Sequence, residues 1–298
     1  MSVDIVIPTH DAKALVLECV ARLQRRDVGH RVIVVDDASS DGTAEAIGLR
    51  HPGVEVVRVD EQRGLAHALN RGSAAGAAEL VLFLNNDVFA APSALERLAE
   101  ALAVDPEASC AGGRLVDPDT NTTQLAYQPR PVPGLAALLV RLLGIERLWP
   151  RNPWTGRFLT EPLAAAGVQR TDRQPAGACL MVRRSVLERI RGWDERYPLW
   201  YEDVDLARRL AAFGPALYVP EAVFEHVGAA STRGWRKHEQ HRRLYRGTMV
   251  YAQAHLPRAQ QIVLALAMAA VCVPRLVAGG EGAHTYRALL RMALRMLR

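Results

Sequence analysis

The stretch Leu80-Val81-Leu82-Phe83-Leu84-Asn85-Asn86-Asp87 decides the fold of this 298-residue chain. Its first five residues are all apolar and predict a strand that is buried on both faces. A carboxylate, Asp87, follows soon after that strand ends. In open α/β sheets the carboxyl ends of the strands border the crevice that binds the ligand. We therefore expect Asp87 to lie in a binding crevice.

Strands and helices alternate through the first hundred residues. We predict strands at 3–7, 31–36, 54–59 and 80–84, and helices at 12–25, 42–50, 65–75 and 93–103. Further along, we predict helices at 135–143, 185–191 and 202–213, with strands at 178–182, 216–219 and 222–225; 117–134 and 149–175 are predicted loops. The alternation is typical of an α/β fold with a mostly parallel central sheet flanked by helices.

Composition and motifs exclude several classes of protein. A chain with 49% hydrophobic and 23% charged residues is expected to fold rather than to stay disordered. The four cysteines form no C-x-x-C pair, so we expect buried thiols rather than a zinc or dithiol site. The sequence contains neither G-x-G-x-x-G nor a P-loop, so it lacks support for dinucleotide or P-loop chemistry.

The carboxyl-terminal region is strongly basic. Residues 233–298 contain 12 Arg or Lys and 2 Asp or Glu, whereas the rest of the chain contains 25 and 30. On charge alone this tail suits nucleic acid or an anionic lipid. Its 12-residue apolar run at 262–273 is shorter than the roughly 20 residues that cross a bilayer. Four arginines from 287 to 298 then predict a basic amphipathic helix, which can lie at a membrane surface or pack on the body.

Two adjacent acids end the second predicted strand. Adjacent side chains of an extended chain point to opposite faces, so one of Asp36 and Asp37 can face the ligand. We assign that place to Asp37, whose carboxylate can accept from a nucleobase N–H or a ribose hydroxyl. Ser40 and Asp41 are expected to cap the following helix, because their side chains can accept from its first amides.

Two other strand ends also carry residues that suit a ligand. Pro8 ends the first strand and leaves the Thr9 hydroxyl facing the crevice. Gly64 allows a tight turn into the third helix and a close approach of ligand. Arg63 or Arg71, near this turn, can reach a phosphate.

Taken together, these segments resemble the family 2 glycosyltransferases, inverting enzymes of the GT-A nucleotide-diphospho-sugar transferase fold. The resemblance covers roughly residues 3–228, and the rhamnosyltransferase-like enzymes of surface polysaccharide assembly are the most similar subgroup. It rests on five segments in order: Val35-Asp36-Asp37-Ala38-Ser39-Ser40-Asp41-Gly42-Thr43, Leu84-Asn85-Asn86-Asp87-Val88, Gly177-Ala178-Cys179, Arg191-Gly192-Trp193-Asp194-Glu195 and Glu202-Asp203-Val204-Asp205-Leu206.

The resemblance implies a role for each matching residue. Asp87 corresponds to the last acid of the family's D-x-D segment, and His226 to a histidine that completes the metal site in several members. The ion would be Mn²⁺ or Mg²⁺, which accept hard oxygen ligands. Asp203 corresponds to the general base. We further expect donor contacts at Pro8, Thr9, Asp11, Asp37, Gly64 and Asn86, and acceptor contacts at Trp200 and Glu202.

The implied reaction moves a hexose or deoxyhexose, such as rhamnose, from a nucleotide-diphosphate sugar to a glycan or lipid-linked glycan. A metal at Asp87 stabilises the leaving diphosphate as a Lewis acid. The acceptor hydroxyl attacks the opposite face of the sugar while Asp203 takes its proton. A single displacement of this kind inverts the anomeric configuration.

Residue patterns alone leave some assignments open. Glu202 and Asp203 both border the packed face of the 202–213 helix, whereas Asp205 turns toward Arg209 four residues later. All three acids also suit a helix N-terminus, whose dipole stabilises negative charge. His226 is equally suited to a core position at a strand end.

The sequence departs from the family pattern in two places. Asn85 stands where the first acid of D-x-D usually falls, and His10-Asp11 replaces the common Tyr-Asn. Two alternatives therefore stay open. One is a sugar-1-phosphate nucleotidyltransferase, although residues 8–14 lack the glycines of that class. The other is a non-catalytic, membrane-associated protein that binds nucleotide sugars.

We expect two units along the chain. Residues 1–232 would form the GT-A-like domain, with a nucleotide-sugar half at 1–115 and an acceptor half at 116–232. Residues 233–298 would form a basic, helical extension that can hold the protein peripherally on the inner face of the cell membrane. Because no basic leader precedes the first strand, we expect a cytoplasmic protein, with no nucleic-acid partner.

Overall fold

The computed structural model describes residues 2–24, 30–156, 163, 166–197, 199–228, 235–279 and 282–298. Its strands are β1 (Val3–Thr9), β2 (Arg31–Asp37), β3 (Glu55–Val59), β4 (Leu80–Leu84), β5 (Val88–Ala90), β6 (Cys110–Val116), β7 (Gln169–Thr171), β8 (Cys179–Arg183) and β9 (Ala216–His226). Its helices are α1 (Lys13–Gln24), α2 (Thr43–Arg50), α3 (Leu65–Ala75), α4 (Ala94–Val104), α5 (Leu135–Leu142), α6 (Ile145–Leu148), α8 (Arg184–Arg189), α9 (Glu202–Leu210), α10 (Lys237–His255), α11 (Arg258–Val277) and α12 (Ala283–Met296), with a 3₁₀ turn η1 (Leu125–Tyr127).

One mixed sheet carries the strand ends that the sequence singled out. Its strand order is β3-β2-β1-β4-β8-β6-β9-β5, and β7 pairs with β9. β1 is parallel to β2 and β4, and β2 is parallel to β3, whereas β8 runs antiparallel to both of its neighbours. The predicted α/β class with a mostly parallel sheet is confirmed. Its connections bring the carboxyl ends of β1, β2 and β4 to one edge.

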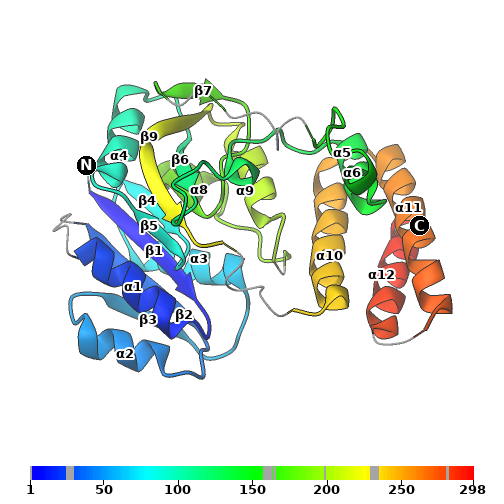
Figure 1. The fold of residues 1–298 in the computed structure, drawn as a ribbon, viewed down its shortest axis with the longest axis horizontal. Coiled ribbons are helices and arrows are strands. Elements are labelled where there is room, and N and C mark those ends of the chain that lie inside the picture. The colour runs from blue at the N-terminus through cyan, green and yellow to red at the C-terminus, as the bar shows by residue number, and fades with distance from the viewer. Residues whose placement is uncertain are drawn as a thin grey trace.

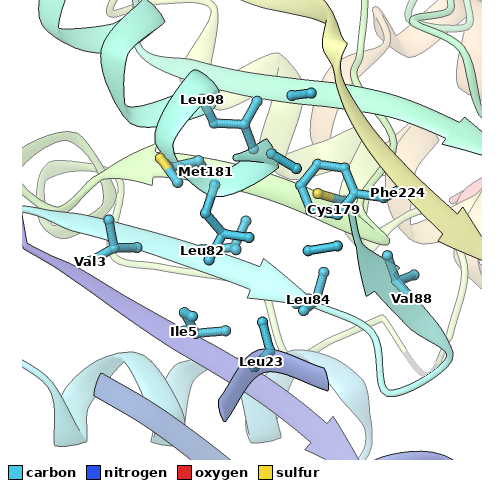
Figure 2. Packing of buried hydrophobic residues seen from close by; sticks show 14 of the residues in the cluster. Val3, Ile5, Leu23, Leu82, Leu84, Val88, Leu98, Cys179, Met181 and Phe224 are labelled. Atoms are coloured by element: carbon cyan, nitrogen blue, oxygen red, sulfur yellow. The ribbon is translucent and has the colours of Figure 1, made fainter. Parts of the chain in front are cut away.

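Helices cover both faces of this sheet, because successive strand residues point in opposite directions. Ile5 and Leu82 pack with α1 and α4 on one face, whereas Val6 and Phe83 pack with α3, α8 and α9 on the other. Figure 2 shows the first of these clusters around Leu82. The continuous apolar run that forms β4 therefore reflects burial on both faces of the sheet.

A helical lobe formed by α5, α6, α10, α11 and α12 lies beside the α/β body (Figure 1). Its apolar core also takes in Tyr197, Tyr201 and Val204 from the body. Because α5 and α6 precede the predicted carboxyl-terminal extension, the lobe combines that extension with part of the expected acceptor half. The predicted boundary at 232/233 lies outside the described residues.

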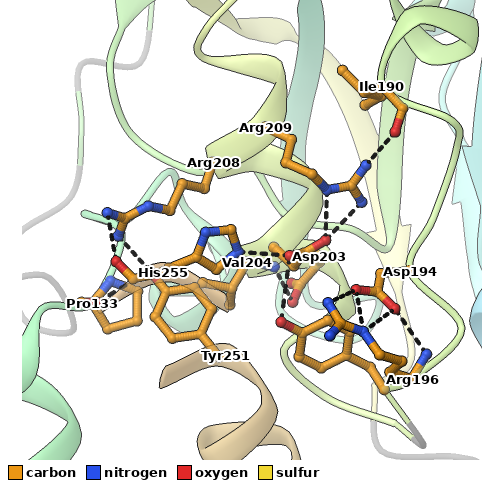
Figure 3. A network of polar contacts seen from close by, with 12 residues as sticks. Pro133, Ile190, Asp194, Arg196, Asp203, Val204, Arg208, Arg209, Tyr251 and His255 are labelled. Atoms are coloured by element: carbon orange, nitrogen blue, oxygen red, sulfur yellow. Dashed lines mark hydrogen bonds and ion pairs between the residues drawn. The ribbon is translucent and has the colours of Figure 1, made fainter. Parts of the chain in front are cut away.

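Buried polar contacts fasten α10 to α9 (Figure 3). Asp205 accepts hydrogen bonds from His255 Nε2 at 2.6 Å, Arg209 Nε at 2.8 Å and the Tyr197 hydroxyl at 3.3 Å. The expected turn of Asp205 toward Arg209 is confirmed. Asp205 thus joins the lobe to the body and is not directed toward a ligand.

Several elements differ from the sequence-based predictions. β9 is one continuous strand where two short ones were predicted, because a register shift opposite Gly113/Arg114 accommodates Pro220. The helix predicted at 202–213 ends at Leu210. Strands β5, β6 and β7 were not predicted, since none has a long apolar run.

The apolar run at 262–273 is part of a longer helix. The expectation that this segment is too short to cross a bilayer is therefore wrong for the helix as a whole. α11 has 20 residues, and length and composition alone would allow it to cross a membrane. Residues 258–261 supply its first turn, and Pro274 lies inside the helix without ending it. The inward face of α11 is buried, while Val263, Leu266, Val273 and Val277 on its outward face are between 45% and 84% exposed.

The predicted basic amphipathic helix is α12, and it packs on the lobe. Tyr286, Leu289, Ala293 and Met296 are buried in the core of the lobe. Its apolar face is therefore already covered. The exposed apolar stripe of this region belongs to α11.

Candidate active site

One cleft of about 1600 Å³ contains the proposed base, metal and acceptor residues and the six donor residues that the resemblance implied. Its walls come from the strand ends of the sheet, from the start of α9 and from the helical lobe. The assigned residues that line it are Pro8, Thr9, Asp11, Asp37, Gly64, Asn86, Asp87, Trp200, Glu202, Asp203 and His226. Tertiary structure thus brings these distant segments together.

Asp37 holds the turn that leads into α3. Its Oδ1 accepts from the backbone N–H of Arg63 at 3.0 Å and its Oδ2 from that of Gly64 at 2.9 Å. Gly64 has φ +95°, a conformation that L side chains rarely adopt. A carboxylate has about four lone-pair positions, so Asp37 can still accept from a ligand.

Arg63 and Arg71 are not among the residues that line the cleft, and a phosphate contact by either of them stays a prediction. The Arg63 guanidinium instead lies 3.4 Å from Glu195 Oε2. The same carboxyl group accepts from Asn70 Nδ2 at 3.0 Å. Glu195 therefore ties α3 to the segment before α9.

The loop after β1 is held by polar contacts to the loop after β2. Asp11 Oδ1 accepts from the Ser40 N–H at 2.7 Å and from the Ser40 hydroxyl at 3.2 Å, so the Ser40 side chain does not cap α2 as predicted. Asp41 accepts from the N–H groups of Thr43 and Lys13, both at 3.1 Å. The capping role of Asp41 is confirmed, and it serves the starts of two helices.

Asp87 and His226 face each other at the end of β4. The Asp87 Oδ2 atom lies 3.8 Å from His226 Nε2, and both side chains are buried. His226 Nδ1 lies 2.7 Å from Gln124 Oε1, and Gln124 Nε2 donates to the His226 carbonyl at 2.8 Å. We assign the imidazole proton to Nδ1, which leaves the Nε2 lone pair on the Asp87 side. Burial lowers the pKa of His226, against the opposing effect of Asp87, and so favours the neutral ring.

This pair fits a divalent cation. It offers one carboxylate oxygen and one imidazole nitrogen, and a hydrogen bond orients the imidazole as in many metal sites. No group of three or more His, Cys, Asp or Glu suited to a metal occurs in the described part of the chain. An ion at this pair would take its other ligands from water and from donor phosphate oxygens, as is common for Mg²⁺.

The Asp203 carboxylate is fixed at the start of α9. Its Oδ2 accepts from Gln174 Nε2 at 2.7 Å and its Oδ1 from the Val204 N–H at 2.8 Å. Gly177 passes so close that a Cβ there would lie 2.6 Å from Asp203 Cβ. The motif Gly177-Ala178-Cys179 therefore makes room for the acid. Gln174, like Gln124, was missed, because each is an amide in a predicted loop without a periodic pattern.

Glu202 is buried beside Asp203. Burial, and then the neighbouring Asp203 charge, raises the pKa of Glu202 to about 8. Its Oε2 atom is buried and finds no hydrogen-bond partner in the described residues. The preceding Trp200 and Tyr201 have φ +66° and +75°, so this turn is strained. A strained turn and an unsatisfied carboxyl group at a cleft suit contact with a ligand.

The chain belongs to glycosyl transferase family 2, whose pattern matches residues 4–191. It is therefore a glycosyltransferase that transfers a sugar from a nucleotide sugar. This membership decides against the nucleotidyltransferase and the non-catalytic alternative.

Curated relatives share much of the chain. An N-acetylglucosaminyl-diphospho-decaprenol L-rhamnosyltransferase of Mycobacterium tuberculosis is 35% identical over an alignment of 213 residues that covers 67% of this chain and 67% of the relative. A pre-mycofactocin glycosyltransferase of the same organism is 29% identical over 236 residues, which are 78% of this chain and 44% of the relative.

Solved structures confirm the GT-A-like fold. The mannosyltransferase PcManGT from Pyrobaculum calidifontis, in complex with GDP-Man and Mn²⁺, is 20% identical with a TM-score of 0.54, covering 99% of this chain and 84% of that one. Residues 1–349 of TarS from S. aureus are 14% identical with a TM-score of 0.53, covering 99% and 71%.

Proposed function

We propose that this protein is an inverting rhamnosyltransferase that uses a nucleotide-diphosphate donor and a lipid-linked glycan acceptor. The observation that carries the proposal is the convergence of Asp37, the Asp87–His226 pair and Asp203 on one cleft. The mycobacterial rhamnosyltransferase supports the choice of sugar and of a diphospho-prenol acceptor. The proposal includes roles for the site residues, which follow.

The strand ends would bind the donor. Asp37 lies at the end of β2 and would accept from the nucleobase or ribose. The donor wall would be completed by five more residues that line the cleft, namely Pro8, Thr9, Asp11, Gly64 and Asn86. Asn86 Nδ2 donates to the Thr9 hydroxyl at 3.1 Å, which ties the end of β4 to that of β1.

Asp87 and His226 would hold Mn²⁺ or Mg²⁺. When bound, the ion supplies Lewis-acid stabilisation of the negative charge that develops on the leaving diphosphate. Asp87 and His226 are both buried and pre-oriented, the latter by Gln124, so little reorganisation is needed when they bind it. Because Asn85 replaces an acid, the protein contributes one carboxylate at this position.

Asp203 would take the proton from the attacking acceptor hydroxyl. Two hydrogen bonds fix its carboxylate, and each oxygen keeps a lone pair for the incoming hydroxyl. Glu202 and Trp200 would orient the acceptor. The buried Glu202 carboxyl group can exchange a hydrogen bond with an acceptor hydroxyl, and the Trp200 ring can pack on the acceptor sugar.

The exposed apolar stripe of α11 would rest on the membrane that carries the acceptor. Val263, Leu266, Val273 and Val277 present apolar surface, and Arg258 and Arg275 are also exposed on this helix. Such peripheral contact would place a cytoplasmic enzyme on the inner face of the membrane. It would also bring the cleft to a lipid-linked substrate.

The test is direct transfer. Purified enzyme is given a panel of nucleotide-diphosphate sugars and a prenyl-diphosphate-linked N-acetylglucosamine, with Mn²⁺ or with EDTA. We expect transfer from the rhamnose donor, loss of transfer with EDTA, and a product of inverted anomeric configuration by NMR. Transfer of another sugar only, or retention of configuration, would contradict the proposal.

A further inference from the structure

The part of the cleft formed by the helical lobe is basic. It contains cations from four helices: Arg141 of α5, Arg147 of α6, Lys237 and Arg243 of α10, and Arg275 of α11. Among the described residues, Glu146 is the one carboxylate that these helices place in the cleft, and it lies 3.8 Å from Arg141. The lobe therefore presents an excess of positive charge to whatever enters.

Three of these cations help to lower the pKa of His241. The His241 ring stacks on Tyr245, with centroids 4.9 Å apart and 13° between the planes. Burial, and then the charges of Arg275, Lys237 and Arg147, lowers the pKa of His241 to about 4, so the ring is neutral at pH 7. None of these three cations pairs with a carboxylate within the described ranges of the chain.

Uncompensated cations in one recess favour an anion. Like charges that face a common space repel one another, and a bound anion removes that cost. Arginine and lysine donors form charge-assisted hydrogen bonds with phosphate oxygens. Because three cations from three helices converge, a ligand with more than one phosphate fits better than a single carboxylate.

This cluster lies on the base side of the cleft. α10 packs directly on the turn before Asp203, since a Cβ at Gly247 would lie 2.7 Å from the Trp200 carbonyl oxygen. The Trp200 and Trp235 rings meet edge to face at 6.0 Å and also line the cleft. The donor-side residues come instead from the ends of β1, β2 and β4.

We propose that Arg147, Lys237 and Arg275 bind the diphosphate of a lipid-diphosphate-linked sugar while a hydroxyl of that sugar reaches Asp203; this rests on the proposed function. The sugar would then lie between the cation cluster and Asp203, where the rings of Trp200 and Trp235 line the cleft. Val277, which is 84% exposed, follows Arg275 by two residues and offers apolar surface to the lipid chain.

The double variant Arg147→Gln/Lys237→Gln tests the cluster. Its matched control is Arg246→Gln/Arg287→Gln, which removes the same charge from exposed positions outside the cleft. Each enzyme is assayed with N-acetylglucosamine linked to farnesyl diphosphate and with its uncharged octyl glycoside. We expect the ratio of kcat/KM for the charged over the uncharged acceptor to fall about tenfold or more in the double variant and to persist in the control. An unchanged ratio, or a raised KM for the nucleotide sugar instead, would overturn the proposal.

Direct binding separates this inference from the proposed function. Farnesyl diphosphate is titrated calorimetrically into wild type and both double variants in EDTA, which excludes any metal-dependent donor site. Weaker binding by Arg147→Gln/Lys237→Gln alone supports the diphosphate site, even if the wild type transfers no sugar. Sedimentation with phosphatidylglycerol vesicles distinguishes the other phosphate source. Loss of vesicle binding with unchanged farnesyl diphosphate binding would assign the cluster to lipid headgroups and overturn the proposal.

Discussion

Replacing the Asp203 carboxylate by an amide should abolish proton transfer while preserving the cleft. In Asp203→Asn the new amide oxygen can keep the hydrogen bond from the Val204 N–H, which is 2.8 Å long in the native chain. Gln174, whose Nε2 lies 2.7 Å from the native Oδ2, can turn its own amide to accept from the new N–H group. The packing against Gly177 is unchanged because the two side chains have the same shape. The substitution therefore removes basicity with little loss of geometry.

The expected loss follows from the chemistry of general bases. Such a base contributes about 10²- to 10⁴-fold to the rate, which corresponds to ~2.7–5.5 kcal/mol of activation free energy. We expect kcat for acceptor-dependent release of nucleoside diphosphate to fall by that factor, with the KM for the donor unchanged. Asp119→Asn, on an exposed turn outside the cleft, is the matched control.

Thermal unfolding of both variants checks the fold, because a loss of ~1 kcal/mol lowers Tm by only a few degrees in a chain of this size. An Asp203→Asn enzyme with wild-type Tm and wild-type kcat would refute the assignment of the base.

Three further predictions concern the metal pair, the lobe and the acid cluster. Gln124→Ala should raise the Mn²⁺ concentration needed for half-maximal transfer about 10- to 100-fold, because His226 loses the partner that orients it; an unchanged Mn²⁺ titration would argue against a metal there. Asp205→Ala should lower the free energy of unfolding by roughly 3 kcal/mol in urea titrations, since it leaves Arg209 and His255 without their buried carboxylate, and a loss near zero would contradict this. Because the pKa of Glu202 is raised, burial favours its neutral form. The stability that this form contributes is fully present below pH 4.5, the ordinary pKa of the group, and is lost as the pH rises through about 8. Glu202→Gln should therefore resist urea better than wild type above that pH and not at about pH 5, and an equal difference at both would refute the cause given.

Local patterns were enough to predict most of the α/β body. Helix α3 and strand β4 begin and end where the sequence predicted, because apolar periodicity reports directly on which faces are buried. The strand-end acids Asp37 and Asp87 were found for the same reason, as polar residues that directly follow buried runs. The sequence could not predict that the Arg63 guanidinium lies beside Glu195, because the two residues are 132 positions apart.

The supporting residues of the site could not be predicted from the sequence. Gln124 and Gln174 lie in segments without periodicity, and only the folded chain places them at 2.7 Å from His226 and Asp203. The basic recess is equally non-local, since Arg147, Lys237 and Arg275 come from three helices that line one cleft. Charge counting located a basic tail, but packing decided that part of it lines the cleft.

By itself, the order of apolar runs predicted the α/β class, and the resemblance of the motifs to a known family predicted the family and proposed roles for its carboxylates. Each buried segment must carry its own apolar residues, so the spacing of these residues along the segment predicts a helix or a strand. Tertiary structure alone decided which amides orient Asp203 and His226, which face of α11 stays exposed and which cations line one cleft. Those contacts join residues far apart in the sequence, as Gln124 and His226 are at 102 positions, so a local pattern does not predict them.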